Sequence, residues 1–317
     1  MSLNVKMQDY RLIDDSVTPL VKRVGDGSIV NRFDKTPTPT KNTDVVCPHF
    51  LELKWAYGCP YDCAWCYLKG TFRFLPTKTK PVIKDLAKVE LHTKRLLEQK
   101  EPEILNTGEI ADSLMLERNG NSFSKLIIPL FENQERHKIL FVTKSDNIRN
   151  LLSAPTHNQV IISFSLNAED VAKKWELGAP SVERRIKAAS SLSKAGYETR
   201  IRIDPMVPIS DWQKAYSNLL NQIFSEFMPS RITFGSLRGL QSTINNSTDR
   251  SWVQFLTEKS NWGKKVDFDL RYEMYSTIIK QLESNFGYKN IALCKETVEM
   301  WDKLDMDYKQ IKCNCIW

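Results

Sequence analysis

The sequence predicts an α/β protein whose strands form a partial (β/α)6 barrel of the TIM type. From residue 49 onward, short apolar segments alternate with longer segments whose apolar residues recur at helical spacing. Strands that are separated by helices pair in parallel through right-handed crossovers. Six such strands are found, and polar or glycine-containing stretches follow several of them. Because active sites in these barrels lie at the carboxyl ends of the strands, these stretches are the places to search for function.

Each element is placed by its own pattern. In the segment 82–99, for example, Leu86, Val89, Leu96 and Leu97 fall near helical spacing, and Gly196 follows the helix expected at 180–194 as a stop signal. Strands are expected at 49–55, 103–106, 138–142, 159–164, 197–203 and 231–234. Helices are expected at 82–99, 122–135, 146–152, 180–194 and 211–227.

The chain divides into three regions. Residues 1–45 have poor periodicity and include a proline-threonine stretch at 34–41 that excludes regular helix or central strand, so they are expected to form an N-terminal extension. Residues 46–245 contain the predicted barrel. Residues 246–317 are expected to form a C-terminal α/β extension with a cysteine-rich tail.

Composition favours a cytoplasmic enzyme. The 317 residues are 41% hydrophobic, but no apolar run approaches a membrane span and no hydrophobic signal region stands at the start, so no membrane partner is expected. The seven cysteines are mostly clustered, which favours metal ligands over disulfides. The net charge of +7 favours a nucleic-acid partner, although the basic residues are dispersed and solvated helix faces explain most of them.

One loop carries the most informative motif, a CxxxCxxC spacing formed by Cys59, Cys63 and Cys66 after Gly58. A four-iron cluster is usually held by four thiolates, so three leave one iron open to another ligand. A zinc site or a disulfide is the alternative. Zinc sites usually combine CxxC pairs with a second pair or with histidines, and no second pair follows within fifty residues.

The spacing resembles the signature of the radical S-adenosylmethionine (SAM) superfamily. The resemblance implies a 4Fe-4S cluster whose open iron is chelated by the amino and carboxylate groups of SAM, and a reductant such as flavodoxin or ferredoxin. It also implies reductive cleavage of SAM to a 5'-deoxyadenosyl radical that abstracts hydrogen from the substrate. Members of this superfamily typically have a six-strand open barrel, in agreement with the fold predicted from periodicity.

Residues after the predicted strands are candidates for binding SAM. Gly108 and Glu109 resemble the superfamily's Gly-Glu segment, in which the glycine admits a close approach and the acidic residue contacts the SAM amino group. Lys144 and Arg202 carry a positive charge that suits the SAM carboxylate. Ser165 and Asn167 carry groups that can hydrogen-bond the SAM carboxylate or ribose. A solvated or salt-bridged role is the alternative for each of the four.

A closer resemblance, across roughly residues 45–290, is to the spore photoproduct lyase branch of this superfamily. It implies that Tyr67 lies beside the cluster, with a catalytic role, and that Lys144 and Ser165 lie in the SAM pocket. The segments that carry it are Cys63-x-x-Cys66-Tyr67-Leu68, Pro102-Glu103-Ile104, Phe141-Val142-Thr143-Lys144, Phe164-Ser165-Leu166-Asn167, Arg185-Ile186-x-Ala188-Ala189 and Lys194-Ala195-Gly196-Tyr197.

One segment departs from that branch. The lyases carry a cysteine after strand two that returns a hydrogen atom to the repaired thymine, and residues 107–113 contain none. The chain is therefore interpreted as a relative with another substrate, a damaged or modified base in nucleic acid being favoured. Two alternatives stay open: a radical SAM enzyme for a small metabolite or peptide, and a non-catalytic iron-sulfur or zinc module that binds nucleic acid.

The remaining cysteines lie outside the loop. Cys294, Cys313 and Cys315 offer three thiolates for an auxiliary cluster or a zinc site, because a CxC turn can direct both sulfurs to one metal. Alternatively, one of them supplies the missing hydrogen atom, or all three are thiols without function. Cys47 is expected to be a small buried apolar residue.

Overall fold

A single ten-stranded sheet organises the molecule. The computed structural model describes residues 3–75, 80–117 and 122–317. Its main sheet has the strand order β1-β2-β3-β4-β8-β9-β10-β12-β13-β17. These strands are β1 (Val5–Arg11), β2 (Val17–Val24), β3 (Val30–Phe33), β4 (Phe50–Leu53), β8 (Ile104–Asn106), β9 (Lys138–Thr143), β10 (Val160–Ser165), β12 (Glu198–Met206), β13 (Arg231–Ser236) and β17 (Ile291–Leu293).

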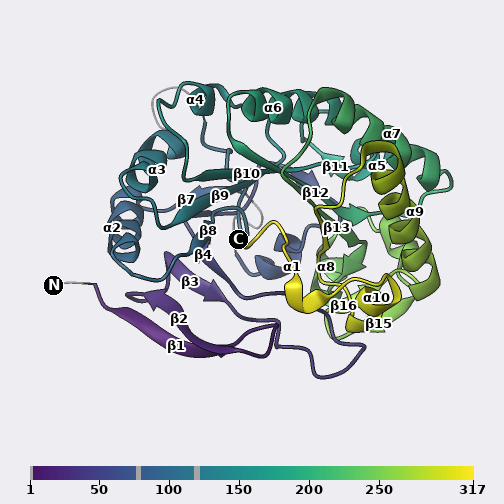
Figure 1. The fold of residues 1–317 in the computed structure, drawn as a ribbon, viewed down its shortest axis with the longest axis horizontal. Coiled ribbons are helices and arrows are strands. Elements are labelled where there is room, and N and C mark those ends of the chain that lie inside the picture. The colour runs from purple at the N-terminus through teal and green to yellow at the C-terminus, as the bar shows by residue number, and fades with distance from the viewer. Residues whose placement is uncertain (1–2, 76–79, 118–121) are drawn as a thin grey trace.

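From β4 to β17 every neighbouring pair in this sheet is parallel. Longer helices follow the strands and lie outside the curved sheet (Figure 1). The predicted partial TIM-type barrel is therefore confirmed. The larger helices are α2 (Leu86–Leu97), α3 (Phe123–Glu132), α6 (Val182–Lys194), α7 (Trp212–Glu226) and α9 (Phe268–Phe286), and shorter ones are α1 (Leu68–Thr71), α4 (Arg149–Leu152), α5 (Glu169–Trp175), α8 (Gln241–Asn246) and α10 (Val298–Lys303).

Small strand pairs lie beside the barrel. β5 (Ala56–Tyr57) pairs with β7 (Val82–Ile83), and β6 (Asp62–Cys63) pairs with β11 (Glu176–Leu177). A three-stranded sheet contains β14 (Arg238–Gly239), β16 (Gly263–Lys265) and β15 (Glu258–Ser260). The helix expected at 82–99 begins later, at Leu86, because β7 occupies its first residues. Asp85 caps α2 by accepting hydrogen bonds from the amides of Ala87 at 2.9 Å and Lys88 at 3.4 Å.

Both extensions contribute strands to the main sheet. β1, β2 and β3 from the N-terminal extension continue it as antiparallel strands beside β4. Sequence periodicity missed them because β1 has a single buried residue, Tyr10, so no apolar alternation marks it. Residues 34–41 contain no helix or strand, as expected from their prolines. At the other end, β17 from the C-terminal extension adds a parallel strand beside β13.

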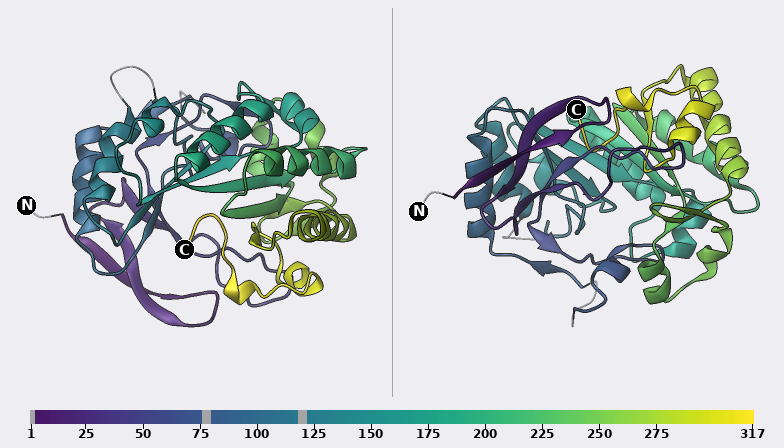
Figure 2. Two further views of the ribbon diagram at one scale, coloured as in Figure 1. Left: turned by 45° about the horizontal axis from the view of Figure 1, so that its top comes forward. Right: turned by 90° about the horizontal axis from the view of Figure 1, so that it is seen from below.

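The C-terminal tail, residues 312–317, returns to the interior of the barrel (Figures 1 and 2). Its Asn314 is completely buried and contacts Ser163 of β10 and Thr233 of β13. One apolar core joins the barrel strands to the surrounding helices. Trp55, Trp175 and Trp252 belong to it and are at most 1% exposed, so they are not surfaces on which a base can stack. Among the described residues, no helix is both long and apolar enough to cross a membrane.

Candidate active site

The cysteine loop leaves the carboxyl end of β4 and is attached to the segment that follows β8. The Gly58 amide donates to the carbonyl of Ile110 at 2.9 Å, and Gly58 forms an isolated parallel bridge with Ala111. Gly58 has φ +82°, a conformation that side chains with a Cβ rarely adopt. The glycine before the first cysteine thus allows the loop to turn directly onto the Gly-Glu segment.

A second attachment holds the other cysteines. Cys63 of β6 pairs with Glu176 of β11, and the amide of Ala64 donates to the carbonyl of Trp175 at 2.8 Å. The Cys66 amide donates to the carbonyl of Cys63 at 3.1 Å, which makes a tight turn between these two cysteines. All three loop cysteines are free, Cys63 being buried and the other two half-buried. The loop is therefore held by two separate segments, the one that follows β8 and the one that contains β11.

The thiol chemistry of the loop fits an iron-sulfur cluster. Burial raises the pKa of Cys59 and Cys66, and it raises the pKa of Cys63 to about 12 although Lys144 opposes the rise. Coordination to a metal deprotonates a thiol outright, so iron would supply the positive charge that these buried sulfurs need. In the part of the chain that the structure describes, no group of three His, Cys, Asp or Glu side chains is placed to hold one metal ion. A four-iron cluster does not require such a group, because each of its cysteine ligands binds a different iron.

Tyr67, which follows the last loop cysteine, contacts the Gly-Glu segment directly. Its hydroxyl group donates to the carbonyl oxygen of Glu109 and lies 3.2 Å from the Oε1 atom of the same residue. Burial, followed by the neighbouring Glu109 carboxylate, raises the pKa of Tyr67 well above its ordinary value. Tyr67 therefore stays protonated and acts as a hydrogen-bond donor between the loop and Glu109.

Gly108 is required by packing against β9. Its amide donates to the Oδ1 atom of Asn106 at 2.9 Å. A Cβ atom at this position would lie 2.6 Å from the Cβ of Val142 and 2.7 Å from its carbonyl oxygen, which is closer than real Cβ atoms approach. In this structure the group that approaches Gly108 most closely is Val142 of β9, so packing alone requires a glycine here.

A buried carboxylate that sequence reasoning missed, Glu176, lies next to the loop. Its Oε1 atom is 3.6 Å from the Nζ of Lys144, and its Oε2 atom is 2.7 Å from the Nη1 of Arg185. Lys144 and Arg185 together lower the pKa of Glu176 even though burial alone would raise it. The sequence offers no metal-ligand spacing or strand-end position that singles out Glu176. Its pairing with Cys63 arises only in the folded chain.

A second missed carboxylate, Asp112, sits between the loop and β9. It accepts hydrogen bonds from the hydroxyl of Thr143 at 2.7 Å, the amide of Lys144 at 2.8 Å and the amide of Leu114 at 3.0 Å. Burial raises the pKa of Asp112, and its charge in turn contributes to the raised pKa of Cys59. Asp112 lies three residues after Glu109, in the segment that follows the second predicted strand. A search of the residues after each strand therefore includes Asp112 as well.

Other parts of the protein engage the side chain of Asn167 and the backbone carbonyl of Ser165. Asn167 is completely buried, donates to the carbonyl of Pro205 at 2.8 Å and accepts from the hydroxyl of Tyr216 at 2.9 Å. This arrangement argues against a direct contact between Asn167 and a ribose, because the side chain already joins β10 to the end of β12. Ser165 is buried, and its carbonyl oxygen accepts from Arg185 at 2.9 Å.

Arg202 faces the C-terminal tail. Its Nη2 atom donates to the sulfur of Cys315 at 2.9 Å, and the Nδ2 atom of Asn106 lies 3.9 Å from the same sulfur. The electrostatic field of Glu109 also reaches Cys315. The tail thus brings a thiol beneath the Gly-Glu segment, a neighbourhood that the order of residues along the chain does not predict.

Cys294 is the first residue after β17 and lies at the carboxyl end of the barrel. The Nη2 atom of Arg238 is 3.6 Å from its sulfur, and Arg238 also pairs with both carboxylate oxygens of Asp204, at 2.8 and 2.9 Å. Burial, followed by the charge of Asp204, raises the pKa of Cys294 to about 12. A small cavity is lined by Cys47, Cys294, Cys313 and Cys315, and Cys47 is half-buried and packs against the apolar core.

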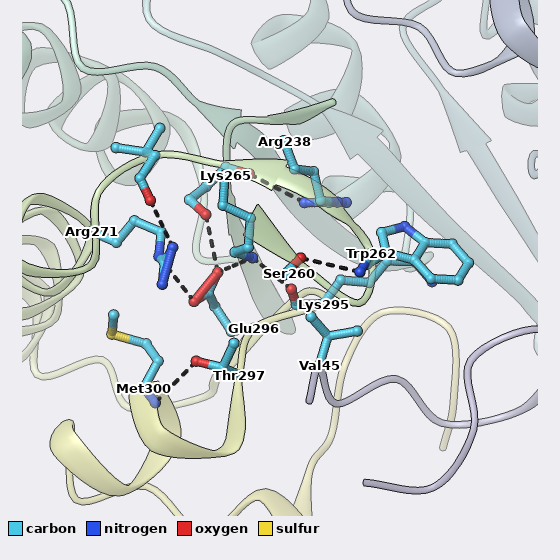
Figure 3. A network of polar contacts seen from close by, with 12 residues as sticks. Val45, Arg238, Ser260, Trp262, Lys265, Arg271, Lys295, Glu296, Thr297 and Met300 are labelled. Atoms are coloured by element: carbon cyan, nitrogen blue, oxygen red, sulfur yellow. Dashed lines mark hydrogen bonds and ion pairs between the residues drawn. The ribbon is translucent and has the colours of Figure 1, made fainter. Parts of the chain in front are cut away.

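A buried ion network surrounds Glu296, two residues after Cys294 (Figure 3). Glu296 is completely buried between Lys265 and Arg271, and its Oε1 atom accepts from the hydroxyl of Ser236 at 3.0 Å. Burial lowers the pKa of Lys265 to about 8, although the Glu296 charge opposes the fall. In Lys295, the residue before Glu296, the Nζ atom lies 3.6 Å from the centre of the Trp262 ring and 3.4 Å from the sulfur of Cys47.

A family model for spore photoproduct lyase matches residues 50–238. This range holds more than half of the chain and contains the cysteine loop, the Gly-Glu segment and the six strands predicted from sequence. The chain belongs to the spore photoproduct lyase family. The resemblance inferred from the motifs is thereby confirmed.

Two curated relatives carry the name of the family. The spore photoproduct lyase of Clostridium acetobutylicum is 28% identical over 188 residues, which are 58% of this chain and 54% of the relative. That of Bacillus subtilis is 27% identical over 176 residues, 54% of this chain and 50% of the relative. This family member therefore spans about half the length of the curated relatives that it matches.

Solved structures of spore photoproduct lyase share the fold. A lyase complexed with dinucleoside spore photoproduct has a TM-score of 0.62 and 19% identity, and the match covers 82% of this chain and 78% of that chain. A variant lyase with bound AdoMet, which is SAM, and dinucleoside spore photoproduct has a TM-score of 0.61 with the same identity and coverage. At this identity the likeness establishes the fold of the family member.

Proposed function

We propose that this chain is a radical SAM enzyme that acts on a damaged or modified base in nucleic acid. Cys59, Cys63 and Cys66 would hold a 4Fe-4S cluster, which, when bound, supplies the electron that cleaves SAM to a 5'-deoxyadenosyl radical. The observation that carries the proposal is the attachment of the three-cysteine loop to the Gly-Glu segment through Gly58 and Tyr67. Relatives named as lyases, and one solved with AdoMet and a dinucleoside lesion, support it.

The residues around the loop have separate tasks in this proposal. Glu109, oriented by Tyr67, accepts hydrogen bonds from the SAM amino group. Lys144 lies near Cys63 and Cys66 and stabilises their thiolate forms by its charge. Asp112 and Glu176 hold the backbone amide and the side chain of Lys144 in place, at 2.8 and 3.6 Å respectively. Each task needs a group that the fold keeps rigid, since binding sites lose efficiency when their groups are poorly positioned.

Return of a hydrogen atom to the substrate requires a donor, and residues 107–113 contain no cysteine. We propose Cys294 for this role. Its pKa of about 12 keeps the thiol protonated at neutral pH, and it follows the last barrel strand, where substrates of such barrels bind. Cys315 is less suited, because the guanidinium group of Arg202 points at its sulfur and favours the thiolate.

The proposal is tested without knowing the substrate. The chain is reconstituted anaerobically with iron and sulfide, then given SAM and dithionite, and 5'-deoxyadenosine is measured by chromatography. We expect thiolate-to-iron absorption and SAM cleavage in the natural chain and neither in the Cys59→Ala/Cys63→Ala/Cys66→Ala variant. Turnover of SAM by the triple variant would refute the assignment. An oligonucleotide containing a spore photoproduct then tests the substrate class.

A further inference from the structure

The C-terminal tail is held tightly at the amino ends of the barrel strands. The Nη1 atom of Arg200 donates to the carbonyls of Asn314 at 3.0 Å and Ile316 at 2.7 Å. The Nη1 atom of Arg231 donates to the carbonyls of Cys313 at 2.7 Å and Ile316 at 2.9 Å. Because Arg200 and Arg231 stand near the starts of β12 and β13, the tail closes the end of the barrel opposite the cysteine loop.

The tail brings Cys313 and Cys315 together. The amide of Ile316 donates to the carbonyl of Cys313 at 3.4 Å, which closes a turn over these residues. Both cysteines also line one small cavity, together with Arg202. Two cysteines two residues apart in a turn have a Cα separation compatible with that of disulfide-bonded cysteines. The pair therefore has the arrangement of a dithiol that can close to a disulfide.

The two sulfurs differ in their surroundings. The Cys315 sulfur accepts from the Nη2 of Arg202 at 2.9 Å, whereas at Cys313 the Nη1 of Arg231 donates to the backbone carbonyl, at 2.7 Å. In agreement with the Arg202 contact, the pKa of Cys315 is lowered by the neighbouring Cys313 and by Arg202, and the pKa of Cys313 is raised by the neighbouring Cys315 and by burial. A thiolate beside a guanidinium group is the attacking species in thiol-disulfide exchange, so Cys315 is the nucleophile and Cys313 is its resolving partner.

Cys315 is reachable from outside through a cavity on this side of the barrel, which we call the floor cavity. Its volume is 260 Å³, and its lining includes Cys315, Cys47, Arg11, Lys309 and Trp317. The side chains of Arg11 and Lys309 are 62% and 46% exposed, so they form a rim at the surface. Both rim cations pair with Asp15, and Asp14 also lines the cavity. This volume lies just below that of sites for drug-sized ligands, about 300–1,000 Å³.

We propose that Cys315 and Cys313 form a thiol-disulfide exchange site for small-molecule disulfides that enter through the floor cavity. The Cys315 thiolate attacks one sulfur of the small disulfide, forming a mixed disulfide and releasing one small thiolate. Cys313, after giving its proton to solvent, attacks the Cys315 sulfur of the mixed disulfide and releases the second small thiolate. The tail loses two electrons, which reduce the small disulfide to two thiols. The exchange uses none of the three loop cysteines, so it needs neither the cluster nor SAM.

The test uses the full chain, reconstituted anaerobically and treated with oxidised glutathione without SAM or nucleic acid. Mass spectrometry of the intact chain and of its peptides follows the products. The natural chain should form a disulfide between Cys313 and Cys315 and release two glutathione molecules. In Cys313→Ser the mixed disulfide on Cys315 should accumulate. In Cys315→Ser, modification of the tail should slow by about tenfold or more, because the remaining thiol is largely protonated.

Cys47→Ser is the matched control, since Cys47 also lines the floor cavity but has no neighbouring thiolate partner in a turn. It should react like the natural chain. Modification of Cys47 with an unreacted tail would overturn the proposal, as would equal rates in Cys315→Ser and the natural chain. Iron or zinc bound to the tail, detected as metal lost in Cys313→Ser/Cys315→Ser, would also overturn it. Far-ultraviolet circular dichroism checks the folding of each variant, and 5'-deoxyadenosine formation reports separately on the proposed function.

Discussion

The hydroxyl group of Tyr67 lies 3.2 Å from the Oε1 atom of Glu109 and also donates to its carbonyl oxygen. This contact joins the residue after the last loop cysteine to the acidic residue proposed to bind SAM. Because the two residues are 42 positions apart in sequence, the contact couples the cluster loop to the second barrel strand.

Replacing Glu109 should weaken SAM binding without removing iron. We expect Glu109→Gln to lower the affinity by about 1.5–3 kcal/mol, the range for hydrogen bonds to charged groups, with normal iron content. Equilibrium dialysis with labelled SAM measures the change. Tyr67→Phe is the matched variant, because it keeps the carboxylate but releases its orientation, and it should cause a smaller loss. Normal affinity in Glu109→Gln would remove this residue from the pocket.

Lys144 is expected to act on the thiolates of the loop. Its charge opposes the burial that raises the pKa of Cys63 and Cys66, so Lys144→Met should raise both pKa values further and lower the iron retained near neutral pH. Lys144→Arg should restore retention. Iron analysis after gel filtration checks this. If iron were fully retained while SAM binding weakened, Lys144 would instead contact the SAM carboxylate.

Cys294→Ala should separate SAM cleavage from repair. Cys294 hydrogen-bonds to Phe234 and Arg238 rather than to the cysteine loop, so formation of 5'-deoxyadenosine should continue. Conversion of a spore photoproduct oligonucleotide to the repaired thymines should fall sharply if Cys294 returns the hydrogen atom. Cys47→Ala, which removes a thiol from the same small cavity, should leave the conversion unchanged. Undiminished repair by Cys294→Ala would show that another group is the donor.

The ion pair between Asp204 and Arg238 should make the free energy of unfolding depend on pH. Burial would raise its pKa, but Arg238 holds it at about 2, below the ordinary 3.8. A depressed pKa stabilises the fold above the unfolded-state pKa, and this contribution disappears as the pH falls through about 2. The free-energy difference between the natural chain and Asp204→Asn should therefore shrink by about 2 kcal/mol between roughly pH 6 and pH 2. Urea unfolding of the metal-free chains measures it, and a pH-independent difference would contradict the ion pair.

Glu296 should be among the most sensitive positions for stability. Removing its charge leaves Lys265 and Arg271 buried without their carboxylate, which typically costs about 3–5 kcal/mol in unfolding free energy. We expect this loss in Glu296→Gln, measured by denaturant unfolding. Glu283→Gln breaks an exposed pair with Lys289 and should change stability far less, because water screens exposed ion pairs. Similar effects of the two substitutions would show that the network contributes little.

Much of the barrel could be predicted from local pattern alone. The strands β9, β10 and β12 have three or more buried apolar residues each, and α6 and α7 carry apolar residues on one face, so periodicity identifies them. The three loop cysteines are recognisable because their ligand spacing lies within eight residues. Edge strands such as β1 could not be predicted, because their register depends on pairing with the rest of the sheet rather than on burial of one face.

The sequence by itself determined the fold class, the cysteine loop and the Gly-Glu segment, since these depend on residues close together in the chain. Only the tertiary structure decided which charges meet. It paired Lys144 with Glu176, directed Arg202 to Cys315 and engaged Asn167 with Pro205 and Tyr216. It also brought the tail into the barrel, 113 residues beyond Arg202 in sequence. The physical reason is that ion pairs and buried hydrogen bonds form between whichever groups packing brings within a few ångströms, and sequence spacing does not encode that proximity.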